Sequence, residues 1–243
     1  MEYKLGRKAI KWDSRTLKVR DYLTPALPAP PVSVDWTRGI ISFGEMLNDQ
    51  LGDCVFAGIG HAIQIWTANT TTEATVPDST IESYYESWAG YDPNDPSTDQ
   101  GYIELDALNK WKKGTFAGHK LLAYADATIS NIAEVKQAIN LFGGVYIGLN
   151  VPNFIMNSIP SVWDVVSDDG GIDGGHCVYV VGYDADTIKF ISWGSLYSMT
   201  TAFWNKYVDE AHALLSQDWI DTKGVDPQGF NLAQLEADLA AIR

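Results

Sequence analysis

The chain has 243 residues and a mass of 26.8 kDa, enough for one large domain or two small ones with a buried core. Hydrophobic residues make up 46% of it and charged residues 20%, which excludes disorder, collagen and coiled coil as descriptions of the whole. No stretch reaches the ~18 uninterrupted apolar residues of a membrane span, and the N-terminus lacks the apolar segment of a secretory signal. The composition therefore predicts a globular protein that makes no membrane contact.

Charge is unevenly distributed along the chain. The net charge is −14, but residues 1–20 carry seven basic residues against Glu2 and Asp13, so this segment is +5 and the remainder −19. An acidic body argues against nucleic acid as the main ligand, because phosphate binding needs a basic face. The basic segment is either solvated, docked on the chain's own body, or available to an acidic protein partner.

The two cysteines, Cys54 and Cys177, cannot form a disulfide framework. Free thiols fit a protein that is cytoplasmic or sits within a virion-like particle, and that is not secreted by a signal peptide. The acidic loop at residues 90–101 resembles a calcium loop only loosely, because a proline occupies one ligand position and the closing glutamate is missing. We expect no metal and no cofactor.

Four prolines between residues 25 and 31 favour an extended segment and divide the chain into an arm, residues 1–31, and a body, residues 32–243. The body has helical periodicity first and strand-like runs later, which predicts an α+β fold. Its expected parts are a helical part at about 45–130, a sheet part at about 131–205 and a helical C-terminal tail at 206–243. The expected helices are 54–68, 79–90, 104–113, 131–141, 204–214 and 232–242, and the expected strands are 145–151, 176–183, 187–193 and 199–203.

Cys54 begins the first of these helices, where unpaired N–H groups and the helix dipole favour a thiolate. His176 lies at the start of a strand, after a glycine-rich run. A cysteine at a helix start and a histidine on a strand form a nucleophile–base pair if the fold brings them together. A buried cysteine is, however, more often inert packing.

Five segments resemble those of papain-like cysteine peptidases, in the family's order along residues 31–205. They are Pro31–Trp36 at the start of the body, Asn48–Ala57 around the cysteine, Leu141–Leu149 across a helix, a turn and a strand, Gly175–Tyr183 around the histidine, and Ser192–Gly194 after it. The resemblance implies a helical subdomain, an antiparallel sheet subdomain and a cleft between them, with Cys54 and His176 as catalytic residues.

The sequence also departs from the family pattern. Where the family has a glutamine that donates to the oxyanion, this chain has Asn48, with Gln50 as the alternative donor. Ile191 stands where the family has the asparagine that orients the histidine, so Ser192 is the nearest polar substitute. The resemblance implies thiol-dependent hydrolysis of a peptide or amide, with a peptide or protein as substrate. Two alternatives remain: a non-catalytic papain-like component of a larger assembly such as a phage virion, and a Cys-His acyltransferase.

Three further expectations concern geometry. The Cys54 sulfur and a ring nitrogen of His176 should lie ~3–4.5 Å apart. The arm should form an extended strap outside the core. His61, two turns after Cys54 on the expected central helix, should be a packed helix residue, whereas His119 and His212 have no motif context. Cys177 should point to the opposite face from His176, into the core.

Overall fold

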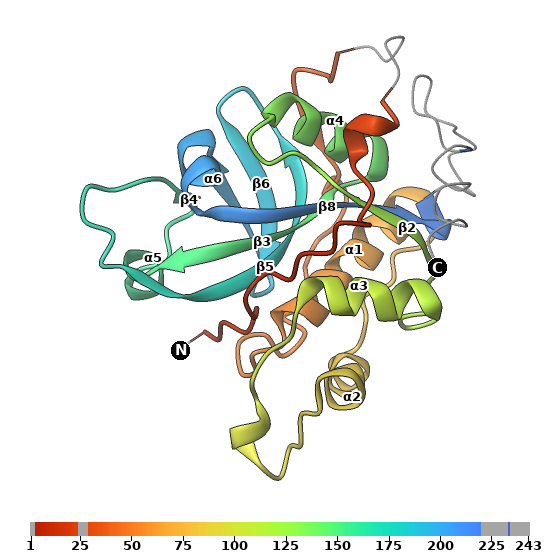
Figure 1. The fold of residues 1–243 in the computed structure, drawn as a ribbon, viewed down its shortest axis with the longest axis vertical. Helices are drawn as coiled ribbons and strands as arrows, with labels where there is room; N and C mark the ends of the chain where they lie inside the picture. The colour runs from red at the N-terminus through yellow and green to blue at the C-terminus, as the bar shows by residue number, and fades with distance from the viewer. Residues whose placement is uncertain (1–2, 24–28, 220–232, 234–243) are drawn as a thin grey trace.

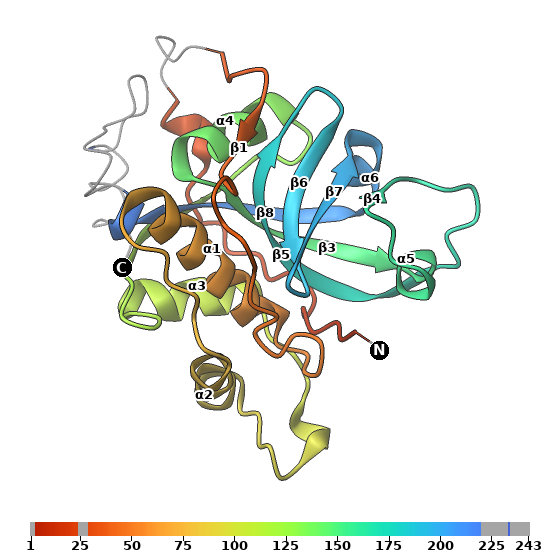
Figure 2. The same ribbon diagram turned by 180° about the vertical axis from the view of Figure 1, so that it is seen from behind.

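The structure is a computed structural model that describes residues 3–23, 29–219 and 233. Helices pack against both faces of a large sheet (Figures 1 and 2). The chain is therefore α+β, as the sequence predicts. None of the helices in the described part is long and apolar enough to cross a membrane.

Most of the helices lie where the sequence predicts them. The helix that begins at Cys54 is buried along nearly its whole length, which explains why apolar residues occur on almost every side of it. The helices are α1 (Cys54–Thr70), α2 (Asp78–Ala89), α3 (Glu104–Lys113), α4 (Ile132–Phe142), α5 (Asn153–Asn157) and α6 (Thr201–Tyr207), with the 3₁₀ turns η1 (Val19–Asp21) and η2 (Pro96–Thr98).

The strands form one sheet in the order β2-β8-β3-β5-β6-β7-β4, and β1 pairs with β5. All pairs are antiparallel except β4 with β7. The strands are β1 (Val34–Asp35), β2 (Leu121–Asp126), β3 (Val145–Pro152), β4 (Val162–Trp163), β5 (Ile172–Tyr183), β6 (Thr187–Ser192), β7 (Ser195–Thr200) and β8 (Val208–Ser216).

The predicted helix at 204–214 is wrong. The helix there ends at Tyr207, and Val208–Ser216 forms β8, hydrogen-bonded to β2 on one side and β3 on the other. Alanine, leucine and glutamate favour a helix locally, but pairing along two strands outweighs a propensity of a few tenths of a kcal/mol per residue. The expected helix at 232–242 lies outside the described residues apart from residue 233.

Two further differences concern strands. The run expected at 199–203 divides into the end of β7 and the start of α6, where the Thr200 side chain caps the helix by accepting the N–H of Phe203. β2, Leu121–Asp126, was not expected, although its burial alternates as in a half-buried strand.

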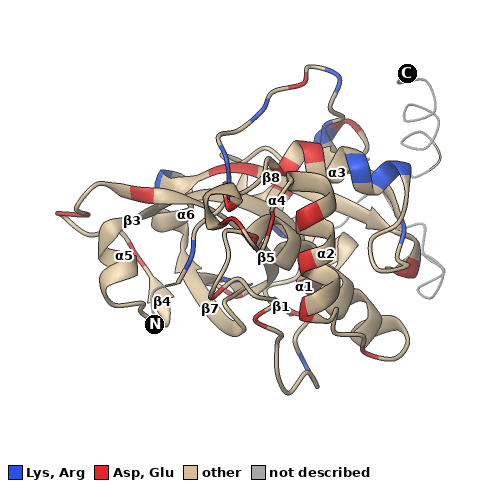
Figure 3. Ribbon diagram, turned by 90° about the horizontal axis from the view of Figure 1, so that it is seen from below, with Lys and Arg blue, Asp and Glu red and all other residues tan. Residues whose placement is uncertain are grey.

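The core consists of two apolar clusters, one on each face of the sheet. One contains α1 with side chains of α2 and α3, and α1 lies along β5. The other contains α4, α6 and the opposite sheet face. Acidic residues are spread over α2 and neighbouring loops, whereas the last turn of α3 carries Lys110, Lys112 and Lys113, which suits the negative end of a helix (Figure 3).

The arm runs over the body from the starts of α1 and β5 to a position beside α4 (Figure 1). The expectation that it lies outside the core is wrong for three of its residues: Val19 and Tyr22 belong to the apolar cluster on the α4 face, and Arg7 is 7% exposed. The apolar side chains of Val19 and Tyr22 pack into the core, so the location of the arm does not depend on its basic residues alone. The proline-rich stretch at 24–28 lies outside the described residues.

Candidate active site

Cys54 is the first residue of α1, and His176 lies in β5. The Cys54 sulfur is within hydrogen-bonding reach of the backbone N–H of Cys177, the residue after His176. Both candidate side chains are fully buried. The fold therefore brings the helix start to the histidine segment of the strand, as the sequence pattern requires.

A tight hairpin positions the polar neighbours of His176. Ser192 pairs with Ser195 at the end of β6 and β7, and the two residues between them, Trp193 and Gly194, have φ values of 46° and 68°. Two left-handed residues give a type I′ turn, whose twist matches that of the strands. This turn places the Ser192 Oγ 2.7 Å from the Nε2 of His176 and stacks the Trp193 ring on the imidazole, with ring centroids 4.6 Å apart.

The two candidate oxyanion donors have different environments. Asn48 is 2% exposed and follows Met46 and Leu47, which have positive φ. Its amide faces the chain around the cysteine, donating to the Leu51 carbonyl at 3.3 Å. Gln50 is exposed and directs its amide at its neighbour Asp49. Asn48 is thus the buried one of the two, and Gln50 lies at the surface.

The arm occupies the space in front of Cys54. The N–H of Gly6 is within reach of the Cys54 sulfur, and the Gly6 carbonyl accepts the N–H of Tyr102 at 2.9 Å. The next residue, Arg7, donates its N–H to the carbonyl of Gly175, which precedes His176. Two consecutive arm residues therefore span from the cysteine to the histidine segment.

Only glycine fits at position 6. A Cβ built there would lie 1.8 Å from the carbonyl oxygen of Gly52, and a Cβ at Gly101 would lie 1.8 Å from the oxygen of Gly6. On the N-terminal side of Gly6, the Tyr3 ring stacks on Trp193, and the Trp193 indole N–H donates to the Lys4 carbonyl. The arm is thus held by close backbone packing as well as by charge.

Burial reverses the expected effect of the helix start on the pKa of the Cys54 thiol. Removal from water raises the pKa of the Cys54 thiol to about 12, more than the N–H groups of Cys177 and Gly6 lower it. Burial, with the Arg7 charge as a smaller cause, lowers the pKa of His176 to about 3. At neutral pH the site therefore holds a thiol and a neutral imidazole.

Beside this site, the Arg7 guanidinium enters a buried acidic pocket that sequence reasoning missed. Its Nη1 lies 2.7 Å from Glu210 Oε1 and its Nη2 2.8 Å from Asp209 Oδ2. Nη2 also donates to Asn150 Oδ1 at 3.3 Å. Arg7 belongs to a basic run of the kind that usually sits in solvent, and both acids fall in the stretch expected to be helical, so no signal in the sequence connected them.

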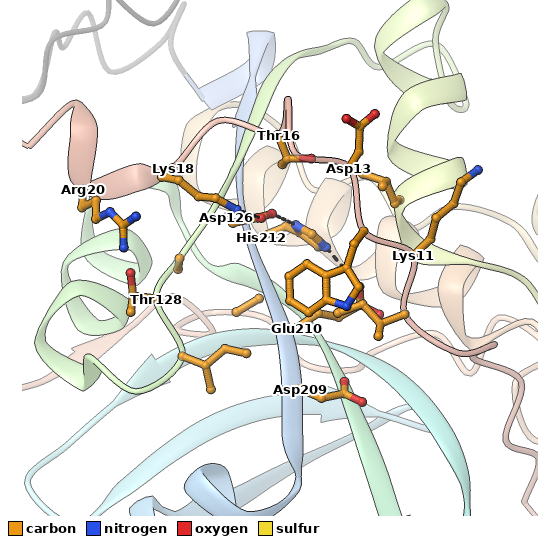
Figure 4. A pocket seen from close by; sticks show the side chains of 16 residues that line it. Lys11, Asp13, Thr16, Lys18, Arg20, Asp126, Thr128, Asp209, Glu210 and His212 are labelled. Atoms are coloured by element: carbon orange, nitrogen blue, oxygen red, sulfur yellow. Dashed lines mark hydrogen bonds and ion pairs between the residues drawn. The ribbon is translucent and has the colours of Figure 1, made fainter.

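The pKa values of Glu104 and Glu210 are displaced in opposite directions. Burial, with repulsion from Glu210, raises the pKa of Glu104 well above its usual range. Although burial opposes it, pairing with His212 and Arg7 lowers the pKa of Glu210. In the same way, Asp126 and Glu210 outweigh burial and raise the pKa of His212 to about 10. His212 faces Asp126, which also binds Lys18 of the arm (Figure 4).

Within the part of the chain that the structure describes, one group of side chains could hold a metal ion. Ligand atoms of Glu104, Glu210 and His212 all lie within 4.8 Å of one another. The cations already there are Arg7 and protonated His212, which neutralise the same carboxylates. The remaining histidines have structural partners: His61, 2% exposed, contacts the Gly44 carbonyl, and His119 contacts Asp218. Cys177 is buried in the core on the α1 side, as expected.

No protein-family model matches the sequence, and no curated protein matches it. The fold is nevertheless similar to that of solved cysteine proteases. Xylellain, a cysteine protease from Xylella fastidiosa, has a TM-score of 0.69 at 15% identity, with 88% of this chain and 96% of that one covered. Procathepsin B S9 from Trypanosoma congolense has a TM-score of 0.62 at 12% identity, with 88% of this chain and 87% of that one covered. A cysteine protease from Carica candamarcensis, in complex with E-64, has a TM-score of 0.53 at 12% identity, with 76% of this chain and 98% of that one covered. The chain therefore has the papain-like fold.

Proposed function

We propose that this protein is a thiol-dependent hydrolase of peptide or amide bonds, with Cys54 as nucleophile and His176 as base, and that the arm holds it latent. The observation that carries the proposal is the meeting of the α1 start with the histidine segment of β5, where Ser192 fixes the imidazole. A serine can replace an asparagine here because one hydrogen bond is enough to select the tautomer.

The arrangement of polar atoms suits acyl transfer. Ser192 engages Nε2 of His176, and Nδ1 has no hydrogen-bond partner among the described residues, so Nδ1 is left to take the thiol proton. The Cys54 sulfur then attacks the carbonyl carbon, the imidazolium returns the proton to the leaving amine, and water releases the acyl group. The Asn48 amide and the Cys54 N–H stabilise the oxyanion, worth roughly 3 kcal/mol in comparable sites.

The arm occupies this site without the geometry of a substrate. A substrate must present a carbonyl carbon to the sulfur and its oxygen to the oxyanion donors, whereas Gly6 presents its N–H to the sulfur and its oxygen to Tyr102. When the arm leaves, water enters and the burial that displaces both pKa values is relieved, so the Cys-His pair can ionise. Release of the arm is thus the activating step.

Labelling with a thiol-directed peptidyl epoxide tests the proposal. We expect slow labelling of the full chain at Cys54, faster labelling of Gly6→Ala, and loss of labelling in Cys54→Ala and His176→Ala. Cys177, also buried, serves as the internal control and should stay unlabelled. Labelling that persists in His176→Ala, or none in any variant, would favour a non-catalytic papain-like component. Transfer of the acyl group to an added amine in preference to water would favour an acyltransferase.

A further inference from the structure

We propose that Cys54 and Cys177 form a dithiol pair, which hydrogen peroxide converts into a reversible disulfide once the arm has left the site. Both cysteines are free thiols in the structure. The inference goes beyond the proposed function, because it gives Cys177 a role and does not require the site to hydrolyse any bond. The disulfide protects the Cys54 sulfur from irreversible oxidation.

The two cysteines lie on elements that face each other. Cys54 is the first residue of α1, Cys177 lies in β5, and α1 lies along β5. Both side chains belong to the apolar cluster on the α1 face of the sheet. The Cys54 sulfur is within hydrogen-bonding reach of the backbone N–H of Cys177. A disulfide needs two residues with neighbouring backbones, and this contact provides them.

Gly58 leaves room for the Cys177 side chain against the helix. It is one helical turn after Cys54, and residues four apart lie on the same face of a helix. A Cβ at Gly58 would lie 3.2 Å from the Cys177 sulfur. The Cys177 sulfur therefore lies against the face of α1 that also carries Cys54.

The surroundings of the two thiols decide which one reacts first. The Cys54 sulfur faces Gly6 of the arm, so it gains water and can ionise with His176 when the arm leaves. Cys177 stays in the core, where burial raises the pKa of its thiol, with the charges of Glu104 and Cys54 as further causes. Cys54 is therefore the thiol that meets the oxidant, and Cys177 is the thiol that closes the disulfide.

The reaction takes two steps. The Cys54 thiolate attacks one oxygen of hydrogen peroxide and becomes a sulfenic acid, the O–O bond breaks, and the other oxygen leaves as water with the proton held by His176. The Cys177 sulfur then attacks the sulfenic sulfur, so that an S–S bond forms and the S–O bond breaks. The hydroxyl group leaves as water with the proton of the Cys177 thiol. Two electrons pass from the two thiols to one peroxide, and an added dithiol reverses the change by exchange.

Mass spectrometry of the oxidised chain tests the inference. Gly6→Ala is treated with a small excess of hydrogen peroxide. The intact mass, the peptides released by trypsin without reduction, and the rate of Cys54 labelling by the peptidyl epoxide are then measured. We expect a mass loss of about 2 Da, a pair of peptides joined through Cys54 and Cys177, and at least about tenfold slower labelling. Dithiothreitol should reverse all three changes.

Cys177→Ala in the same background is the matched variant, because it removes only the second sulfur. Peroxide should raise its mass by about 32 or 48 Da, as Cys54 becomes a sulfinic or sulfonic acid, and dithiothreitol should not restore labelling. Cys54→Ala should gain no oxygen at Cys177, because that thiol stays in the core.

The outcomes separate the dithiol pair from the proposed function. The same irreversible mass gain with and without Cys177, or disulfide-linked dimers in place of the internal bond, overturns the pair and leaves the hydrolase proposal intact. An internal disulfide in a chain that no epoxide labels supports the pair and overturns the hydrolase. If Gly6→Ala does not fold, longer exposure of the unaltered chain to peroxide gives the same mass and peptide readouts.

Discussion

The Nε2 atom of His176 lies 2.7 Å from the Oγ of Ser192, and the Trp193 ring stacks on the same imidazole. The serine engages one nitrogen and the indole covers one face, and the other nitrogen, Nδ1, has no hydrogen-bond partner among the described residues. A single two-residue hairpin turn positions both groups.

Ser192→Ala should therefore reduce Cys54 labelling by about tenfold, whereas His176→Ala should reduce it by about a thousandfold. The serine only orients the ring, and the stacked indole still restrains it, but the histidine carries the proton. Rates of epoxide labelling in the Gly6→Ala background measure both effects. An equal and complete loss in Ser192→Ala would mean that the serine is a full member of the catalytic group.

Gly6→Ala should raise the labelling rate of Cys54 at least about tenfold relative to the unaltered chain. The added Cβ would lie 1.8 Å from the backbone oxygen of Gly52, a contact that must expel the arm or shift the backbone. Gly114→Ala is the matched control, because a Cβ there meets nothing within 4 Å. If Gly6→Ala folds and its thiol stays as protected as before, the arm is not the barrier.

Arg7→Lys should also release the arm, although it keeps the charge. Lysine cannot bind Asp209 and Glu210 with two separate nitrogens, so about a tenfold faster labelling is expected. Lys11→Met should change the rate less than about twofold, because the Lys11–Asp106 pair is exposed. Raising the salt concentration should also change the labelling rate less than about twofold, because the buried ion pairs of Arg7 are little screened. A large effect of salt on the rate would show that exposed ion pairs hold the arm in place.

The sequence predicted the positions of those site residues whose surrounding helix or strand pattern agrees with the motif in which they occur. Cys54 follows a turn and opens a helix that is apolar all round, and His176 begins the buried part of β5, so each could be placed from its own neighbours. The helix start predicts a lowered pKa for the Cys54 thiol, but burial in the folded chain raises it. Sequence periodicity contains no information about which distant segment will cover a site.

The acidic pocket could not be predicted for a related reason. Arg7 and Glu210 are separated by 203 positions, and β8, which carries Glu210, has the composition of a helix. Its conformation is determined by pairing with β2 and β3, which is visible only after the sheet is assembled.

His212→Gln should make the free energy of unfolding less dependent on pH between 7 and 9.5. The pKa of His212 is raised from 6.5 to about 10 in the fold by Asp126 and Glu210, so the folded chain holds this proton more tightly than the unfolded chain. The stabilisation is complete below about pH 6.5 and is lost as the pH rises through about 10. Over this interval the free energy of unfolding of the unaltered chain should fall by roughly 2–3 kcal/mol more than that of the variant.

Urea unfolding at several pH values measures the difference. His119→Gln is the control, because His119 is half-buried and contacts Asp218 alone among the carboxylates described. Parallel pH curves for the unaltered chain and His212→Gln would show that His212 is neutral in the fold, and the charge balance of the acidic pocket would then depend on Arg7 and Lys18.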